Sequence, residues 1–520
     1  MAAETATTRG RTQDTTAPVR LGGLAAVAEA AWMGFALASE ILEPLQGLRR
    51  RAVAVLPPRM PRLAVGAGLL TREFSIPEAA FLLMASFFLS AALGAVRQVL
   101  FNAEFGAGAE ASAYYAAFRL PDLLYSLIAG GALSSAMIPV LVAARAGGPA
   151  AEWRLTNLVL STLSAVFAVL VLLGELFAPA FVSGLLAPGF DRATGELTVR
   201  LTRLMLLQSL VLALGSVATA VLNSRNQFLL TALSVTSHNL TLIAGILAAR
   251  AYPPLGIYGP ALGVLGGAVL QTLILLPGLL AGGFRLRPIW DPADPDLRAV
   301  VRLLVPNGLS VGVSYAAAIV DTAFGSLAPD SAALPALHNA WLLVGLPIAL
   351  LGQAVGQSAF PRLAAHADAG RWAEMRRTLL GALGAALLLA VPALLGLLLL
   401  GRPIIHLLFE RGKFDPAAGA LTYTVLAAFA LGLPAYVATE VITRGLIALR
   451  DTRTPLATNT IQLAGRAALI GLLLSQVGTI AIPLALAATA SLETLVLGAV
   501  LLLEIRRLAG RAPGPGGPPG

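Results

Sequence analysis

Long apolar runs recur along almost the whole chain, and they constrain the fold more than any other feature. Many exceed the roughly 20 residues that a helix needs to cross a bilayer. They are rich in Leu, Ala, Gly and Val and lack the alternation of polar and apolar residues that is typical of barrel strands. Charged residues make up only 12% of the chain, about half the roughly 25% usual in soluble domains. We therefore expect an all-α polytopic membrane protein.

The apolar runs predict about twelve transmembrane helices. The expected spans are 77–101, 114–144, 155–182, 200–222, 229–250, 255–282, 300–327, 335–364, 377–400, 418–447, 455–475 and 478–504. Alternate loops are rich in arginine, as at Arg145, Arg225 and Arg450, whereas the opposite loops contain fewer, such as Arg192 and Arg250. Because basic loops face the cytoplasm, both termini are predicted to be cytoplasmic.

The sequence repeats itself with a period of about 223 residues. AEWRLTNL at 151–158 matches AEMRRTLL at 373–380, and the later loop LLAPGFD at 185–191 matches LLFERGKFD at 407–415. An even number of spans in each repeat gives both copies the same orientation, which is a transporter architecture. We predict two parallel six-helix bundles, 74–292 and 293–508, around a central cavity. A duplicated bundle without transport activity is the alternative.

The two ends of the chain differ from the apolar middle. Residues 1–73 are expected to form an extension that is disordered at its start and then forms an amphipathic helix on the membrane surface, rather than an extra span. The tail 509–520 is rich in Gly and Pro and is predicted to be disordered.

The sequence offers no set of residues suited to catalysis. It has no Cys, four His and no HExxH, which argues against thiol chemistry and a zinc site. It also lacks a GxxxxGK[ST] loop and a GxSxG elbow. We expect neither an enzyme nor a cofactor, and the net charge of +9 reflects membrane topology rather than a nucleic-acid partner. Transport would depend on a coupling ion, the membrane potential or the substrate gradient.

Charged residues within the spans are candidate functional residues, because a buried charge in a membrane usually faces protein or a wet cavity. Arg97 lies near the end of the first span, where its side chain could also extend to a lipid headgroup. Arg119 and Asp122 flank Pro121 in an RLPD sequence that predicts a break at the start of a helix. Asp321 lies late in the seventh span.

Further polar residues lie in the later spans. Glu440 and Arg444 are four residues apart on one helix face, which favours an ion pair. Arg466 and Glu493 lie in the last two spans, where they could neutralise each other or line the cavity. Asn239 could satisfy packing needs or line the transport path.

Residues 93–141, LGAVRQVLFNAEFGAGAEASAYYAAFRLPDLLYSLIAGGALSSAMIPVL, resemble the opening of the MurJ (MviN) family. This family belongs to the multidrug/oligosaccharidyl-lipid/polysaccharide exporter superfamily. Later matches are VLNSRNQF at 221–228 and RGLIALRDTRTP at 444–455. The resemblance implies a flippase that moves lipid II, a polyprenyl-diphosphate-linked glycan lipid, across the bacterial cytoplasmic membrane by alternating access.

The resemblance also implies substrate-binding residues. Arg97 and Arg119 are expected to face the diphosphate, which guanidinium groups bind well. Asp122, Asn239 and Asp321 are further candidates.

The chain departs from the family pattern at several positions, where it has Ala91, Ser112, Tyr125-Ser126, Gly130 and Trp341-Leu342 in place of charged residues. There are therefore two alternatives to a lipid II flippase. One is an exporter of another lipid-linked glycan or amphiphile, and the other is a non-transporting scaffold for envelope synthesis.

Overall fold

The computed structural model describes residues 72–129 and 132–511, and every regular element in these ranges is helical. Nearly all of the predicted N-terminal extension lies outside the described residues, as do Gly130 and most of the predicted tail. The first half contains α3 (Ile76–Phe105), α4 (Ala109–Ala117), α5 (Arg119–Ala129), α6 (Ala132–Ala146), α7 (Pro149–Phe181), η1 (Val182–Leu186), α8 (Arg192–Ser224), α9 (Leu229–Ala251), η2 (Pro253–Leu255) and α10 (Tyr258–Ala281). The second half contains α11 (Pro295–Leu327), α12 (Ala333–Pro347), η3 (Ile348–Gln353), α13 (Ala354–Asp368), α14 (Trp372–Leu408), α15 (Pro416–Leu431), α16 (Leu433–Ala448), α17 (Arg453–Val477), η4 (Gly478–Ile480) and α18 (Ala481–Arg511).

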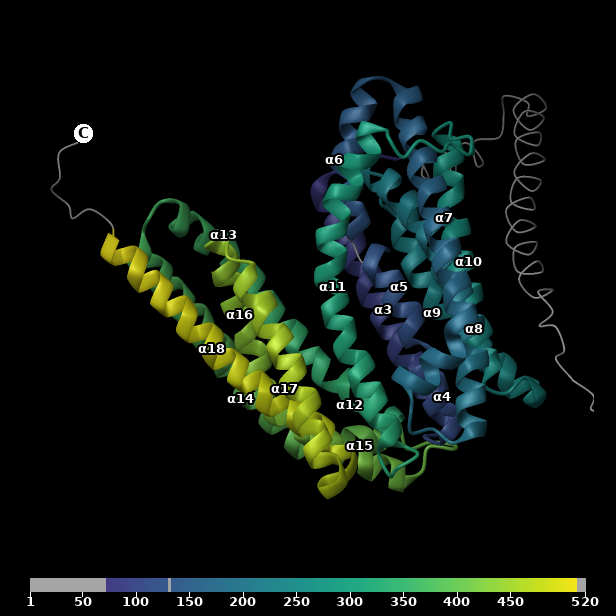
Figure 1. Ribbon diagram of the computed structural model, residues 1–520, viewed down its shortest axis with the longest axis vertical. Helices are drawn as coiled ribbons and strands as arrows, with labels where there is room; N and C mark the ends of the chain where they lie inside the picture. The colour runs from purple at the N-terminus through teal and green to yellow at the C-terminus, as the bar shows by residue number, and fades with distance from the viewer. Residues whose placement is uncertain (1–71, 130–131, 512–520) are drawn as a thin grey trace, which may run out of the picture. The chain divides into compact units, whose positions relative to one another are not determined.

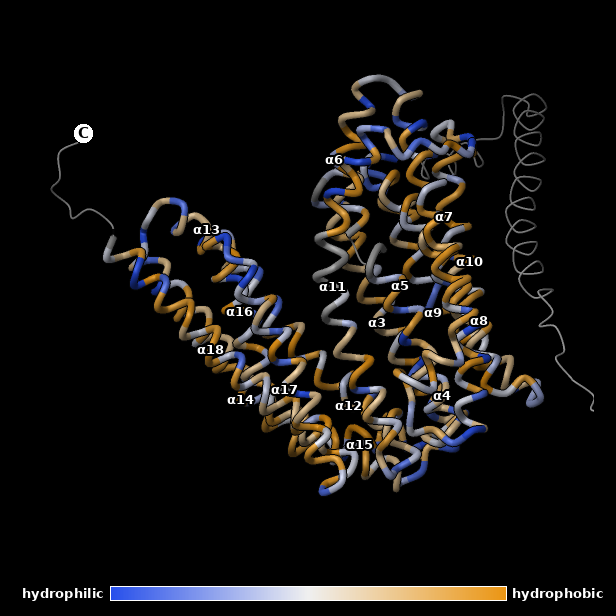
Figure 2. Tube along the Cα trace, viewed as in Figure 1, coloured by the Kyte–Doolittle hydropathy of each residue, from blue (hydrophilic) through white to orange (hydrophobic). Residues whose placement is uncertain are grey.

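The helices are long and apolar enough to make this a multi-pass membrane protein. Among the described residues, eight helical segments could cross a membrane, or up to nine if α15 and α16, bent by 44°, form one span. Large apolar side chains such as Phe88 and Leu399 are 79% and 75% exposed, as expected for residues that face lipid. Figure 2 shows apolar residues along much of the long helices, such as α7, α10 and α18. The polytopic helical class is confirmed, whereas the count of twelve spans remains a prediction.

The first half is built around α8, which packs against α4, α5, α6, α7 and α10. Beside it, α9 packs against α3 and α10 (Figure 1). Glycines allow α9 and α10 to approach closely, because a Cβ atom on Gly245 would lie 2.4 Å from the carbonyl oxygen of Gly259. This packing holds α3 and α9, which carry Arg97 and Asn239, side by side.

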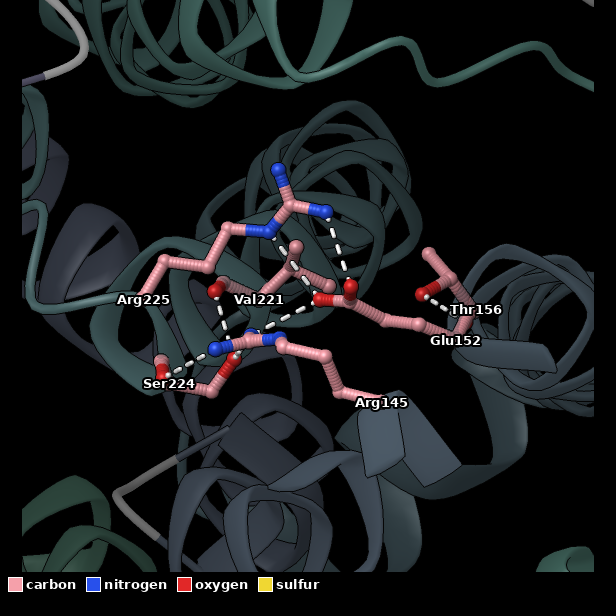
Figure 3. A network of polar contacts seen from close by, with 6 residues as sticks. All are labelled: Arg145, Glu152, Thr156, Val221, Ser224 and Arg225. Atoms are coloured by element: carbon pink, nitrogen blue, oxygen red, sulfur yellow. Dashed lines mark hydrogen bonds and ion pairs between the residues drawn. The ribbon is translucent and has the colours of Figure 1, made fainter. Parts of the chain in front are cut away.

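A buried charge cluster joins α6, α7 and α8 at the end of the first half (Figure 3). Glu152 is only 1% exposed, and its carboxylate accepts hydrogen bonds from Arg145 at 2.8 Å and from Arg225 at 2.9 and 3.0 Å. Arg145 also donates to Ser224, and Arg225 lies over the ring of Trp153 at 4.2 Å. The matching residue of the second repeat, Glu374, is 54% exposed. The two repeats therefore treat the same position differently.

The second half packs α14, α15, α16 and α18 around an apolar core that includes Met375, Val437, Val441 and Leu501. A π-helical turn, η3, follows Pro347, whose ring cannot supply a backbone N–H to the preceding helix.

Helix α11 connects the two halves. Its first turns contribute Leu297 and Val300 to an apolar cluster that includes Leu133 and Leu155, and the helix packs against α5 and α6 (Figure 1). Its later turns contact α12 and α17. The segment predicted to begin the second bundle thus starts with a helix that packs largely on the first.

The predicted break at RLPD is confirmed. Helix α4 ends at Ala117 and α5 begins at Arg119, with Phe118 between them. Pro121 lies in the first turn of α5, where no backbone N–H is required. The break places Arg119 and Asp122 at the start of a helix, next to the end of α4.

Candidate functional site

A charged cavity of about 210 Å³ lies between helices of the two halves. It is formed by α3, α4, α5 and α9 from the first half and by α12 from the second. Its lining residues are Arg97, Gln98, Phe101, Tyr114, Tyr115, Phe118, Arg119, Asp122, Leu242, Ile246 and His338. Three of the five residues that sequence reasoning assigned to substrate binding therefore line the same space.

Arg97 is held by a neutral partner. Its Nη1 donates a hydrogen bond to Oδ1 of Asn239 at 3.1 Å. The Nδ2 of Asn239 in turn donates to Oγ of Ser90 at 2.9 Å and to its carbonyl oxygen at 3.1 Å. Asn239 does not line the cavity, so its contact with the site is through Arg97. The Arg97 side chain is thus tied to α9 rather than extended along the lipid-facing surface.

Arg119 is held in the same manner from the second half. Its Nε donates to Oγ1 of Thr322 on α11 at 2.8 Å, which leaves both terminal nitrogens for other partners. Asp122 has no cation within 4.0 Å among the described residues. Two cations and one carboxylate thus give the cavity N–H donors for an anion and an acceptor for a hydroxyl or amide.

Buried amides close one wall of this cavity, and sequence reasoning missed them. The Nε2 of Gln98 donates to Tyr115 at 2.7 Å and to Oδ1 of Asn339 at 2.9 Å, and Nδ2 of Asn102 donates to the same Asn339 oxygen at 3.0 Å. His338 stacks on Tyr115 with ring centroids 4.3 Å apart. The available signal was the pair of amides four residues apart in an apolar run, which marks one face of α3.

Two loops make matching contacts between the repeats. A Cβ atom on Gly189 would lie 2.3 Å from the carbonyl oxygen of Ser326, and one on Gly412 would lie 2.2 Å from that of Ala103. The two glycines, and the two residues they meet, are each related by the repeat period. Each loop therefore packs against the first long helix of the other repeat.

The remaining charged candidates lie in the second half, away from the cavity lining. Asp321 on α11 forms a salt bridge with Arg466 on α17. Of the two alternatives given for Arg466 and Glu493, mutual neutralisation is therefore wrong, because the guanidinium of Arg466 is directed to α11 instead of α18. Glu440 and Arg444 form the expected ion pair at 3.7 Å.

Glu493 accepts a hydrogen bond from Oγ1 of Thr458 at 3.2 Å. Within the part of the chain that the structure describes, no cluster of three or more His, Asp or Glu residues could hold a metal ion.

The architecture is that of a multi-pass helical transporter. Over 82% of this chain and 96% of the other, it is similar to an inward-facing multidrug resistance MATE family transporter of the MOP superfamily, with a TM-score of 0.68 and 14% identity. It is also similar to a structure of lipid II flippase MurJ in an inward closed conformation, with a TM-score of 0.70 and 24% identity, covering 82% of this chain and 90% of that one.

The chain belongs to the lipid II flippase MurJ family, whose family model matches residues 101–508. A lipid II flippase MurJ of Burkholderia cenocepacia is 31% identical over 71% of this chain and 72% of its own length. A probable lipid II flippase MurJ of Rhizobium tropici is 30% identical over 72% of this chain and 71% of its own length. The family resemblance found in residues 93–141 is thus confirmed.

Proposed function

We propose that this protein is a flippase that moves lipid II across the bacterial cytoplasmic membrane by alternating access. Membership of the MurJ family supports the reaction, and the cavity between the repeats supports the mechanism. The observation that carries the proposal is the pair of arginines, Arg97 and Arg119, each held by a neutral side chain. Because neither is neutralised by a salt bridge, both retain charge for an anionic headgroup.

In this mechanism the two arginines bind the diphosphate of the polyprenyl-linked glycan. Asn239 and Thr322 position them from opposite halves, so binding spans both repeats. Asp122 accepts a hydrogen bond from the sugar or peptide part of the headgroup. Asp321 acts on the substrate less directly. It pairs with Arg466 and precedes Thr322, the residue that holds Arg119.

We further propose that the chain crosses the membrane twelve times, in two six-helix bundles covering 74–292 and 293–508. This count treats α4–α6, α12–α13 and α15–α16 each as one interrupted span, and it places both termini in the cytoplasm by the distribution of arginine. The matching contacts of Gly189 and Gly412 support two parallel repeats. Opening these contacts would expose the cavity to the side opposite the arginine-rich loops.

Transport of lipid II in vesicles tests the proposed function. The full-length protein is reconstituted in proteoliposomes with headgroup-labelled lipid II, and the fraction moved is measured as loss of access to a membrane-impermeant quencher. Arg97→Gln and Arg119→Gln are compared with Arg192→Gln, which removes a 93% exposed arginine that pairs with Glu196 on the surface of α8.

Each cavity variant is expected to lower the transport rate about 10- to 100-fold, because a charged hydrogen bond contributes about 1.5–3 kcal/mol. The Arg192 variant is expected to transport like the wild type. A wild-type protein that does not move lipid II, or cavity variants that match the control, would contradict the proposal.

A different lipid-linked glycan is the second candidate substrate, and the composition of the site supports it. Ala91, Tyr125, Ser126 and Leu342 stand where the family resemblance leads us to expect arginine, so the site has fewer partners for a diphosphate. Competition in the same vesicles between lipid II and another polyprenyl-diphosphate glycan decides between them. A wild-type protein that moves neither lipid favours a scaffold role instead.

A further inference from the structure

Helix α17 carries a polar face that runs through the second half of the protein. Thr458, Gln462 and Arg466 follow one another at intervals of four residues, so they lie on one side of the helix. Each has a polar partner on a neighbouring helix. Oγ1 of Thr458 lies 3.2 Å from Oε1 of Glu493, Nε2 of Gln462 donates to Thr489 at 3.1 Å, and Arg466 pairs with Asp321.

This polar face ends next to the cavity. Asp321 is followed in α11 by Thr322, which accepts the hydrogen bond from Arg119. The distance from Thr458 to Arg466 along α17 is about 12 Å at 1.5 Å per residue. Three polar pairs, spaced along one face of α17, therefore lie between Glu493 and the residue that holds Arg119.

Glu493 lacks the cationic partner that the other carboxylates of the long apolar helices have. Within the described segments long and apolar enough to cross a membrane, each of the other Asp and Glu residues has an Arg or Lys nitrogen within 4.0 Å. Glu493 has only the hydroxyl of Thr458. It lies roughly 18 Å along α18 from Ala481, well inside the helix.

The charged groups around α18 do not compensate this carboxylate. The helices packed against it contribute Glu440 and Arg444 from α16, Arg453 and Arg466 from α17, and Asp296, Arg298, Arg302 and Asp321 from α11. In α14 the titratable groups lie near the two ends, at Glu374, Arg376 and Arg377 and at Arg402 and His406, and α15 has only Tyr423 as a titratable group. None of these cations lies within 4.0 Å of Glu493.

The hydroxyl of Thr458 is suited to both protonation states of the carboxyl group. Its Oγ1 lies 3.1 Å from the carbonyl oxygen of Pro455 and 3.2 Å from Oε1 of Glu493. A hydroxyl has one proton to donate, so it donates to Glu493 when the carboxylate is ionised. When Glu493 is protonated, the hydroxyl instead donates to Pro455 and accepts from the carboxylic acid.

We propose that Glu493 is a proton-binding site that couples a proton gradient to transport, with the polar face of α17 linking it to the cavity. An uncompensated carboxylate within a membrane is costly, and binding a proton removes that cost. Protonation changes the hydrogen bond to Thr458 and hence the position of α18 against α17. This movement reaches Arg119 through Arg466, Asp321 and Thr322. The inference rests on the proposed transport function for its consequence, but the proton site itself is independently testable.

Carbodiimide labelling tests the site without requiring transport. Dicyclohexylcarbodiimide adds to protonated carboxyl groups in apolar surroundings, and peptide mass spectrometry locates the adduct. The full-length protein in lipid nanodiscs is labelled over a range of about pH 5 to 9. Labelling of Glu493 is expected to rise several-fold as the pH falls. Glu504, which lies on the same helix and pairs with Arg507, is the control carboxylate. Absent or pH-independent labelling of Glu493 overturns the proposal.

The coupling role is tested in the lipid II vesicles with imposed pH gradients. The wild-type rate is expected to change by up to about tenfold per pH unit, and Glu493→Gln is expected to reduce this to less than about twofold while headgroup binding is retained. Glu504→Gln should keep the wild-type response. A rate that follows sodium instead of pH, or a Glu493→Gln variant with full pH dependence, overturns the coupling role. A wild-type protein that fails to transport lipid II under every gradient tested refutes the proposed function instead. Carbodiimide labelling still decides the proton site in that case.

Discussion

Replacing Glu152 by Gln should destabilise the protein far more than the same change at Glu374, although the two residues occupy matching repeat positions. Glu152 is 1% exposed and accepts three hydrogen bonds from Arg145 and Arg225, which are 35% and 16% exposed. A glutamine keeps one acceptor oxygen but turns an NH₂ group toward a guanidinium. Removing one partner of a buried salt bridge costs about 3–5 kcal/mol, and the partial exposure of both arginines lowers our expected value to about 2–4 kcal/mol.

Glu374 provides the matched control, because it contacts His366 and Arg371 from a 54% exposed position. An exposed pair contributes about 0–1 kcal/mol, so Glu374→Gln should change the free energy of unfolding very little. Reversible unfolding by dodecyl sulfate in mixed micelles, followed by tryptophan fluorescence, measures both variants. The reasoning is refuted if Glu152→Gln costs less than about 0.5 kcal/mol or no more than Glu374→Gln, since a buried, doubly paired carboxylate cannot behave like a surface one.

Three further changes test the contacts at the cavity and the loops. Alanine at Gly189 or at Gly412 should separate the loop from its facing helix, because the new Cβ would meet a carbonyl oxygen. The chain has no Cys, so Ser112→Cys provides a single thiol as a reporter. This thiol should react several-fold faster with an impermeant maleimide in each alanine variant than in the protein that keeps both glycines. Arg119→Lys should weaken headgroup binding about tenfold, as judged by titration, because lysine cannot keep the Thr322 bond and also contact a diphosphate. Burial alone would raise the pKa of Glu410, but hydrogen bonds from Arg402 and His406 outweigh it and hold the pKa below the usual 4.5. The stability contributed by this carboxylate should therefore be complete above about pH 4.5 and fall as the pH drops through the folded-state pKa. The melting temperature should fall over the same pH range, and this pH-dependent fall should be absent in Glu410→Gln.

The sequence predicted features that depend on local chemistry. Hydropathy alone identified the membrane class, because a lipid solvent requires apolar helices. The break before Arg119 followed from the position of Pro121, and the pairing of Glu440 with Arg444 followed from helical spacing. These predictions needed no knowledge of which helices pack together.

Features that depend on helix packing could not be predicted in the same manner. Arg466 pairs with Asp321, a residue far away in sequence, and not with Glu493 in the adjacent helix. Spacing cannot choose between two carboxylates on different helices. The amides of Gln98 and Asn339 likewise meet only because α3 and α12 come together. Helix α11 packs on α5 and α6, and its own hydropathy pattern does not specify which helices it will meet.

The matching contacts of Gly189 with Ser326 and of Gly412 with Ala103 have an evolutionary consequence. A surface that binds its own counterpart in this reciprocal way is isologous, the kind of interface that relates the subunits of a two-fold homodimer. We infer that the ancestor was a homodimer of a half-length chain, whose gene was duplicated and then fused. Fusion freed each copy to change alone, so one repeat could bury its glutamate while the other left it in water. Matching positions of the two halves can therefore differ in chemistry, as Glu152 and Glu374 differ in exposure, which two copies of one identical chain cannot achieve by sequence.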